Sequence, residues 1–361
     1  NSMCCLSEAL GMSLPGSALI PAPYGERLAS SFKAGRQIVD LVNKGINARQ
    51  VITKESMRNA IKVMMAICGS TNAVLHLAAI ANEADLDMNV VEEFRELNKV
   101  TPQIAKVNPA AKWDMEDFYK AGGIPRVMTR LGNLLDPSCL TCTGKTVKAN
   151  LEGFHYQYPD NPEIIKTVEA PFSKTGGIAV LQGNLAPHTA ISKPGAIDPK
   201  LHRFTGKAKC FNSEEEAEEA ILGGKIKEGD VVVIRYEGPK GGPGMREMFK
   251  AMKYMYGVGL AKKAALITDG RFSGTNNGCF VGHISPEAAE GGPIAIVEDG
   301  DEISIDVIEG KLTLHVSDEE IKKRFASWKR PHKDIPKGYL RLYSKVASSA
   351  DKGAIIADEE V

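Results

Sequence analysis

Residues 263–283 constrain the fold more than any other stretch, because a short apolar run there ends abruptly in a glycine-containing loop. The apolar run, Ala264 to Thr268, has the length and composition of a buried strand. The loop that follows places the hydroxyl of Ser273 between two glycines, which let a backbone come close to a ligand. Open α/β sheets put their ligand sites just past strand ends, so the stretch predicts a ligand site around Ser273.

A second strand-like run upstream, Val231 to Ile234, also ends in a glycine-rich loop, at 237–248. Two such units in one half of the chain predict a single site built from both loops. Glu247 in the second loop carries the carboxylate oxygens that a hard cation prefers, although a lone carboxylate in such a loop is usually solvated. Ser273 has no His–Asp pair in obvious spacing and no Gly-x-Ser-x-Gly elbow, and a nearby multivalent metal would make its hydroxyl a stronger acid. The two loops therefore make more chemical sense together than apart.

The composition argues against two classes of partner. With 361 residues, two domains are expected, and 43% hydrophobic with 25% charged residues is ordinary for a soluble globular protein. The 45 basic and 45 acidic residues give a formal net charge of +0 without a basic block, which disfavours nucleic-acid binding. No apolar run reaches the roughly 18–20 residues that span a bilayer, and no signal-peptide pattern opens the chain. We therefore expect neither a nucleic-acid nor a membrane partner.

The seven cysteines indicate a reduced, intracellular protein, since they are odd in number and lie mostly in apolar or glycine-rich contexts. Cys139 and Cys142 have the spacing of a zinc half-site or a redox pair, but no second pair completes four ligands. Cys4 and Cys5 would point in different directions on a helix. Plain packing is the favoured interpretation for all four.

The expected elements divide the chain into two parts. Helices dominate up to about residue 165, and the polar stretch 150–173, with three prolines, is interpreted as a linker. Helices are expected over 2–12, 24–44, 73–83, 88–98, 114–132, 213–222, 244–258 and 318–328. A further helix is expected to begin after an N-cap at Thr53. Strands are expected over 176–183, 188–193, 208–211, 230–236, 264–268, 293–300, 301–307 and 311–316. The expected fold is α/β, with an α-rich first domain over 1–165 and a mixed β-sheet or barrel-like domain with peripheral helices over 174–355.

The break Gly69-Ser70-Thr71-Asn72 separates two very apolar helices. The backbone amides of 70–72 would lie at a helix N-terminus, where anions bind readily. An ordinary helix–helix turn, with Ser70 or Asn72 as the cap, explains the pattern equally well. His76 lies one turn further on and, like His283, is either a satisfied core histidine or part of the site.

Several longer stretches of the chain resemble one family. They are NSMCCLSEALGMSLPGSA (1–18), GSTNAVLHLAAIA (69–81), LTCTGKTVKANL (140–151), GGIAVLQGNLAP (176–187), VIRYEGPKGGPGMREM (233–248), ALITDGRFSG (265–274) and GHISPEAAEGGPIAIVEDGDEISID (282–306). On these motifs, which run from position 1 to about 354, the chain resembles the dihydroxy-acid dehydratases. The wider family includes phosphogluconate dehydratase and the sugar-acid dehydratases.

The resemblance implies an enzyme, a hydro-lyase that converts a 2,3-dihydroxy acid into a 2-keto acid. In the family an iron–sulfur cluster acts as Lewis acid on the C3 hydroxyl, and Mg²⁺ holds the carboxylate and the C2 oxygen. By matching motifs, Ser273 would take the C2 proton, Thr275 would assist at the substrate, and Glu247 would bind Mg²⁺. Weaker assignments to substrate binding are Ser70, Thr71 and His76. A metal that stabilises the developing enolate suits the weak acidity of the C2 proton.

The resemblance also implies that other metal ligands precede Asn1. The family's three cluster cysteines, an aspartate and a modified lysine have no match in this sequence, so none of its cysteines is assigned to the cluster. We expect the chain to be a truncated form that is inactive alone. A homodimer in the cytoplasm is the implied assembly and location, with organellar targeting left open by the missing N-terminus.

The substrate is expected to be the dihydroxy acid of valine and isoleucine biosynthesis, because residues 233–248 most resemble that branch. The stretch 249–260 and the pair Asn276-Asn277 depart from it, which keeps a sugar acid, aldonate or phosphogluconate, as the alternative. A second alternative, from another class, is a non-catalytic binding or assembly relative.

Overall fold

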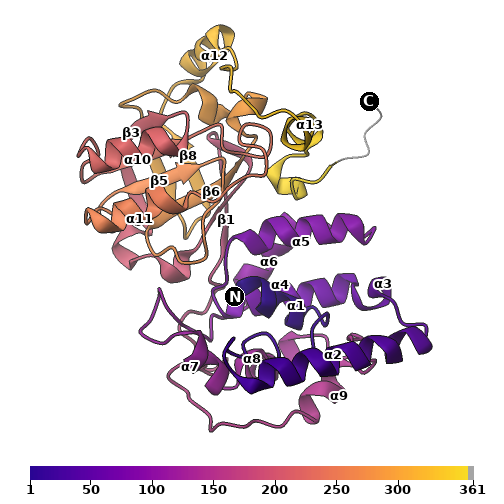
Figure 1. The fold of residues 1–361 in the computed structure, drawn as a ribbon. Helices are drawn as coiled ribbons and strands as arrows, with labels where there is room; N and C mark the ends of the chain where they lie inside the picture. Colours follow the sequence, from indigo (N-terminus) through magenta and orange to yellow (C-terminus); the bar gives the residue numbers. More distant parts are fainter. Residues whose placement is uncertain (357–361) are drawn as a thin grey trace. The chain divides into compact units, whose positions relative to one another are not determined.

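The computed structural model describes residues 1–356. It is a mixed α/β structure, as the sequence predicts, and the chain divides into two compact units (Figure 1). The first unit comprises residues 1–73 and 80–178, and the second comprises 74–79 and the chain from 179 onward. Within residues 1–356 no helix combines the length and the hydrophobicity needed to cross a membrane.

The first unit is helical. Its helices are α1 (Ser2–Ala9), α2 (Gly25–Asn43), α3 (Ala48–Val51), α4 (Lys54–Ala66), the ends of α5 (Asn72–Glu83), α6 (Val90–Val100), α7 (Met115–Lys120), α8 (Gly123–Leu131) and α9 (Val147–Glu152). The predicted cap of α4 is confirmed: Thr53 Oγ1 accepts from the Ser56 amide at 3.2 Å, and Ser56 Oγ accepts from the Thr53 amide at 2.9 Å. These reciprocal bonds satisfy amides that the helix leaves unpaired. Helices α1, α6 and α8 pack against α4, whose apolar side chains are buried.

The second unit is built around a closed barrel. Its strands are β1 (Ala179–Gly183), β2 (Ala186–Ser192), β3 (Arg203–Phe211), β4 (Asp230–Ile234), β5 (Ala265–Thr268), β6 (Cys279–Ser285), β7 (Glu302–Asp306) and β8 (Lys311–Leu314). In the described residues they follow the order β1-β2-β6-β5-β4-β3-β7-β8. Strands β3, β4, β5 and β6 run parallel, and Ile234 at the end of β4 is in register with Thr268 at the end of β5. The loops after β4 and β5 therefore leave the same edge of the sheet.

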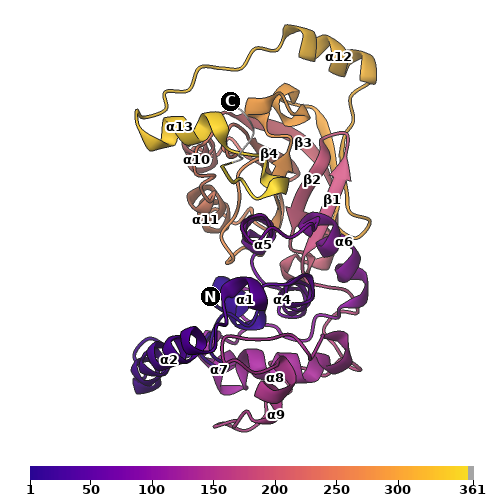
Figure 2. The ribbon, with the colours of Figure 1, turned by 90° about the vertical axis from the view of Figure 1, so that its right-hand side faces the viewer.

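Helices α10 (Glu214–Leu222) and α11 (Phe249–Gly257) pack together and cover β3, β4 and β5 on one side (Figures 1 and 2). Successive strand residues point to opposite faces. Val231 and Val233 thus enter the barrel core, while Val232 and Leu266 pack against Met252 of α11. Burial on both faces explains why β4 and β5 are continuous apolar runs rather than alternating ones.

Two predictions about this unit are wrong. The stretch 293–300 was predicted as a strand, but Pro293–Ile296 is a 3₁₀ helix. It follows Gly291, at φ 76°, and Pro293 has no amide to donate to a neighbouring strand. Strand β6 was not predicted, because the glycines at 278 and 282 interrupt its apolar pattern; in the structure His283 within it adopts a positive φ of 55°.

Several helix predictions also need correction. The helix expected over 114–132 is two helices, since Gly122 and Gly123 adopt φ values of 103° and 54°. The helix expected from 244 begins at Phe249. Helix α12 (Asp318–Ser327) agrees with the sequence, and α13 (Tyr339–Val346) was not predicted. The segment expected to be a linker makes bridges from Ser173 and Ile165 to residues 103–105.

Candidate active site

Asp269 joins the two glycine loops within the second unit. It is fully buried directly after β5, and its carboxylate accepts the amides of Tyr236 at 3.0 Å, Glu237 at 2.9 Å and Ala288 at 2.9 Å. Burial raises the pKa of Asp269 above its usual range, and the three amide bonds oppose that rise. The predicted association of the two loops is thus present, with one carboxylate as its centre.

Glu287 fastens the same region from a third segment. Its two oxygens accept the amides of Lys240 at 2.7 Å and Gly241 at 2.8 Å. Burial, and then the neighbouring Asp269, raises the pKa of Glu287. Gly238 is required here, because a Cβ would lie 2.7 Å from a Glu287 carboxylate oxygen. We call residues 237–248 the glutamate loop.

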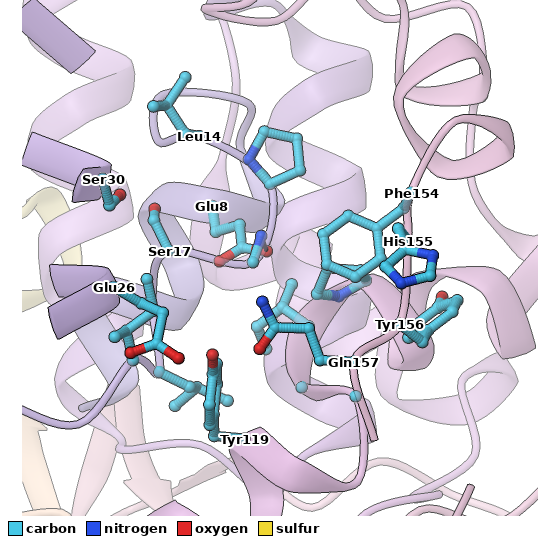
Figure 3. A pocket seen from close by; sticks show the side chains of 18 of the residues that line it. Glu8, Leu14, Ser17, Glu26, Ser30, Tyr119, Phe154, His155, Tyr156 and Gln157 are labelled. Carbon is cyan, nitrogen blue, oxygen red and sulfur yellow. Dashed lines mark hydrogen bonds between the residues drawn. The ribbon is translucent and has the colours of Figure 1, made fainter. Parts of the chain in front are cut away.

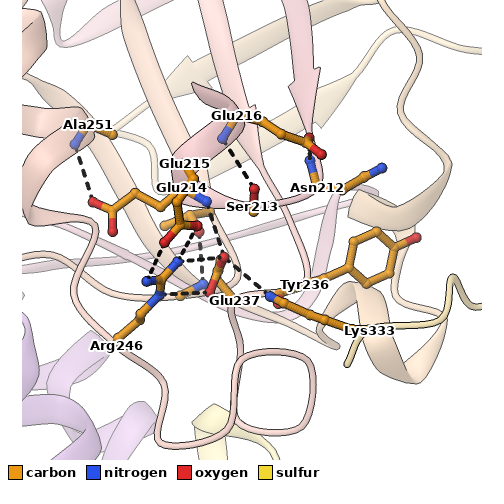
Figure 4. Close-up of polar contacts among 12 residues, drawn as sticks. Asn212, Ser213, Glu214, Glu215, Glu216, Tyr236, Glu237, Arg246, Ala251 and Lys333 are labelled. Atoms are coloured by element: carbon orange, nitrogen blue, oxygen red, sulfur yellow. Dashed lines mark hydrogen bonds and ion pairs between the residues drawn. The ribbon is translucent and has the colours of Figure 1, made fainter. Parts of the chain in front are cut away.

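Glu237 is a third buried carboxylate, 1% exposed, at the start of the glutamate loop. Its oxygens lie 3.2 Å from Arg246 and 3.3 Å from Lys333, and it accepts the Glu214 amide at 3.1 Å. Figure 4 shows Arg246 and Lys333 both directed at it. Arg246 also makes two 2.7 Å bonds to Glu215 and lowers the pKa of that carboxyl to about 2. The residue before Glu247 is therefore held from two sides.

Glu247 lies beside Arg271, the residue two positions before Ser273. Glu247 and Arg271 form a parallel backbone bridge, and the Met248 amide donates to the Arg271 carbonyl at 2.7 Å. His76 is in electrostatic contact with both: burial lowers its pKa, Arg271 lowers it further, and Glu247 raises it. The middle of α5 belongs to this second unit, so three predicted site elements share one region.

His283 is buried in β6, next to the same loops. It is 1% exposed, and its amide donates to the Gly270 carbonyl at 2.8 Å. Burial lowers the pKa of His283 to about 3, with further lowering by Arg271 and His76, so its imidazole is neutral. Its Nε2 has no hydrogen-bond partner among residues 1–356.

Residues 271–278, which we call the serine loop, carry Ser273 and Thr275. The Thr275 hydroxyl lies 3.5 Å from Ser273 Oγ, at the limit of a hydrogen bond. Phe272 anchors the loop by stacking on Phe280, with ring centroids 5.4 Å apart. Beyond Thr275, the Asn277 amide donates to the Tyr256 hydroxyl at 2.7 Å. Ser273 is half-buried and Thr275 is exposed.

Comparison with known proteins assigns the chain to a family. Residues 1–150 match the family model of the dihydroxy-acid/6-phosphogluconate dehydratase N-terminal domain, and residues 163–354 match that of the C-terminal domain. The chain belongs to this dehydratase family. The predicted resemblance is confirmed, and the barrel with both glycine loops lies in the matched C-terminal part.

Curated relatives in this dehydratase family are similar along almost the whole chain. The chain is 50% identical over 360 residues to a dihydroxy-acid dehydratase of Caldanaerobacter subterraneus, covering 99% of the chain and 64% of the relative. It is 51% identical over 356 residues to one of Thermodesulfovibrio yellowstonii, with the same two coverages of 99% and 64%. The chain therefore spans about 64% of the length of these dehydratases.

Ser70 and Thr71, the weaker site candidates, lie buried in the first unit. Ser70 Oγ accepts the Asn72 amide at 3.3 Å, and the Ser70 amide donates to Ser2 Oγ at 2.9 Å. The Ser70 hydroxyl thus satisfies one amide in the turn before α5, whereas the N-cap residue of that helix is Thr71, neither of the two residues expected as the cap, and its side chain makes no capping bond. A role for Ser70 and Thr71 in substrate binding stays a prediction.

The residues present fit the metals of the dehydratase family unequally. Glu247 offers carboxylate oxygens suited to Mg²⁺, which needs further oxygen ligands. Residues 1–356 contain no group of three or more His, Cys, Asp or Glu side chains placed to hold a metal ion. Burial raises the pKa of Cys5 to about 12 and those of Cys139 and Cys142 to about 11. Within residues 1–356 none of these cysteines belongs to a group of three metal-ligating side chains, so they do not form the cysteine set that an iron–sulfur cluster needs.

A cavity of about 260 Å³ in the first unit contains none of the predicted site residues (Figure 3). Aromatic side chains line it, Tyr119, Phe154 and Tyr156 among them. Glu8 reaches its wall, but its carboxylate accepts the amides of Gly16 at 2.7 Å and Ala18 at 2.8 Å. Burial raises the pKa of Glu8 to about 7. Glu8 thus fastens the loop after α1.

Sequence reasoning missed the charged residues that support the two loops. Asp269 and Glu237 each follow a predicted strand closely, which was a usable signal. Glu287, and Lys193, whose Nζ donates to the Gly274 carbonyl in the serine loop at 3.0 Å, had no such signal, because each lies far along the chain from the loop that it contacts. Their roles come only from the folded arrangement.

Proposed function

We propose that this protein is a hydro-lyase that converts a 2,3-dihydroxy carboxylic acid into a 2-keto acid, as a dihydroxy-acid dehydratase of branched-chain amino-acid biosynthesis. Loss of the C2 proton and of the C3 hydroxyl releases one water and leaves an enol, which rearranges to the keto acid. Two curated dihydroxy-acid dehydratases at 50% and 51% identity support this choice of substrate. The observation that carries the proposal is the junction of the serine loop with the glutamate loop, where Glu247 and Arg271 form a backbone bridge and the Met248 amide donates to the Arg271 carbonyl.

In this proposal Ser273 takes the C2 proton. The Thr275 hydroxyl, 3.5 Å away, donates to Ser273 Oγ and stabilises the charge that develops there. Glu247 would contribute one carboxylate ligand to Mg²⁺, which when bound would supply positive charge that stabilises the developing enolate. Arg271 and His76 adjoin Glu247 and keep its surroundings polar. The iron–sulfur cluster implied by the resemblance has no ligand set among residues 1–356, so no step is assigned to it.

The partner and location remain parts of the proposal. A small-molecule dihydroxy acid is the substrate, and a homodimer in the cytoplasm is the assembly and location that the resemblance implies. A sugar acid is the competing substrate, since Asn276 and Asn277 lie in the serine loop itself.

The test uses protein made from the complete coding sequence, with its cluster reconstituted under anaerobic conditions and Mg²⁺ added. We expect keto-acid formation from 2,3-dihydroxyisovalerate and little from gluconate or 6-phosphogluconate. Turnover of the sugar acids alone would transfer the proposal to that branch. No turnover of any of them, with an intact cluster spectrum, would favour the non-catalytic alternative.

A further inference from the structure

Lys193 is a buried charged residue whose ammonium reaches the serine loop. It follows β2 directly, is 6% exposed, and its Nζ donates to the Gly274 carbonyl at 3.0 Å. Antiparallel pairing fixes its origin, because Ser192 is in register with Val281 of β6. The loop that Lys193 contacts leads directly into β6. The ammonium is therefore held one peptide unit from Ser273.

Among residues 1–356 the charge of Lys193 is not balanced by a neighbouring acid. No carboxylate of residues 1–356 lies within 4.0 Å of its Nζ. Taking a charge out of water is costly unless an opposite charge compensates it. A carbonyl oxygen provides a hydrogen bond but only a partial charge.

The adjacent residue shows that a neutral group can do the structural part of this work. Ser192 Oγ, fully buried, donates to the Phe280 carbonyl at 2.9 Å. Both residues therefore join the end of β2 to the segment around β6 through a backbone carbonyl. A lysine in the second position adds a positive charge that holding the loop does not require.

We propose that Lys193 is a positioning residue that holds the Gly274 peptide and provides the positive charge that favours the alkoxide form of Ser273. The negative charge that compensates the ammonium is the one that appears on Ser273 Oγ when its proton leaves. Lys193 thus acts through Ser273 and needs no contact with substrate. This inference rests on the proposed role of Ser273 as the base.

The first test measures the serine itself, independently of dehydration. The full-length holoprotein is treated with a small sulfonyl fluoride, which forms a bond to a serine oxygen and releases fluoride, and labelling of Ser273 is followed by peptide mass spectrometry. We expect Lys193→Met to slow labelling about tenfold or more and Lys193→Arg to retain most of it, because only Met removes the charge. Ser192→Ala is the matched control and should label at the wild-type rate. Equal labelling of wild type and Lys193→Met would overturn the proposal.

The second test separates charge from shape during turnover. We expect Lys193→Met to lower kcat about 10²-fold with KM within about threefold, the pattern for a contact that acts in the transition state. In Lys193→Ala, propylammonium should restore part of kcat, whereas propanol of similar shape should not. A raised KM with unchanged kcat would mean that Lys193 binds substrate, and equal rescue by propanol would mean that it only fills space; either result overturns the proposal.

The results distinguish a failure of the proposed function from a failure of the inference about Lys193. If wild type dehydrates no dihydroxy acid but labelling still depends on Lys193, the proposed function is wrong and the inference stands. If wild type is active and neither labelling nor kcat responds to Lys193→Met, the inference is wrong and the function stands.

Discussion

The glutamate loop and the serine loop leave the same edge of the barrel but are held very differently. Three buried carboxylates fix the glutamate loop, with Asp269 and Glu287 accepting its amides and Glu237 pairing with Arg246. The serine loop is joined to the glutamate loop at Arg271, has Phe272 in the core and, beyond Phe272, makes single bonds to Lys193 and Tyr256. The proposed metal ligand therefore lies in a loop held by many buried hydrogen bonds, whereas the proposed base lies in a loop held by few contacts.

This difference suggests a division of labour between the loops. A ligand for a small cation has to be placed accurately, and supporting hydrogen bonds provide that accuracy. A base has to exchange a proton with substrate and product, and its half-buried loop leaves room for both. Substitutions in the two loops should therefore have different effects. Those around the glutamate loop should affect stability and metal binding, whereas those in the serine loop should affect the rate of the chemical step.

The largest effect should come from Ser273→Ala. Removing the proposed base should lower kcat by about 10³-fold or more, because the remaining groups cannot take the C2 proton. The variant should keep the cluster's visible absorbance and its thermal stability, since within residues 1–356 the half-buried hydroxyl makes only the long contact to Thr275. Steady-state kinetics on the full-length holoenzyme measure the effect. Near-normal turnover would refute the assignment of Ser273 as the base, and the serine loop would then have no assigned role in the chemical step.

Glu247→Gln should have the next largest effect. Losing one carboxylate charge should weaken Mg²⁺ binding by about 10- to 100-fold, so that activity returns only at high Mg²⁺. Titration of activity with Mg²⁺ gives the apparent affinity. Glu290→Gln, which loses only the ion pair with Lys240, is the matched control and should titrate like wild type. An unchanged Mg²⁺ dependence in Glu247→Gln would show that the glutamate loop has another purpose.

The buried carboxylates predict how stability depends on pH. Because burial raises the pKa of Glu287 above its unfolded value, the folded protein binds more protons, and this contribution is present at low pH and lost as pH rises through the raised pKa. Urea midpoints between pH 7 and 9 should fall for wild type and fall less for Glu287→Gln. This window lies above the ordinary pKa of histidine, so His283 does not contribute to the difference. A steeper fall in the variant would contradict the carboxylate account.

The sequence predicted the strands that carry both loops, because β4 and β5 are short apolar runs closed by glycines. It also predicted that their loops meet, and Ser273 and Glu247 were identified from motif resemblance. It could not predict β6, whose glycines and left-handed His283 break the strand pattern. Nor could it predict Glu287 or Lys193, because their partners are 47 and 81 residues away and the pairing of strands distant in sequence brings them together.

The smallest effect should come from Tyr256→Phe, which probes the far end of the serine loop. The phenol accepts the Asn277 amide at 2.7 Å, and losing it should cost about 1 kcal/mol, because that amide loses its partner. If the serine loop is weakly held, this loss should also lower kcat a few-fold while the Mg²⁺ dependence stays as in wild type. Denaturation curves and steady-state kinetics measure the two effects. A shifted Mg²⁺ affinity would show instead that the two loops move as one body. The serine loop would then not be held independently of the glutamate loop.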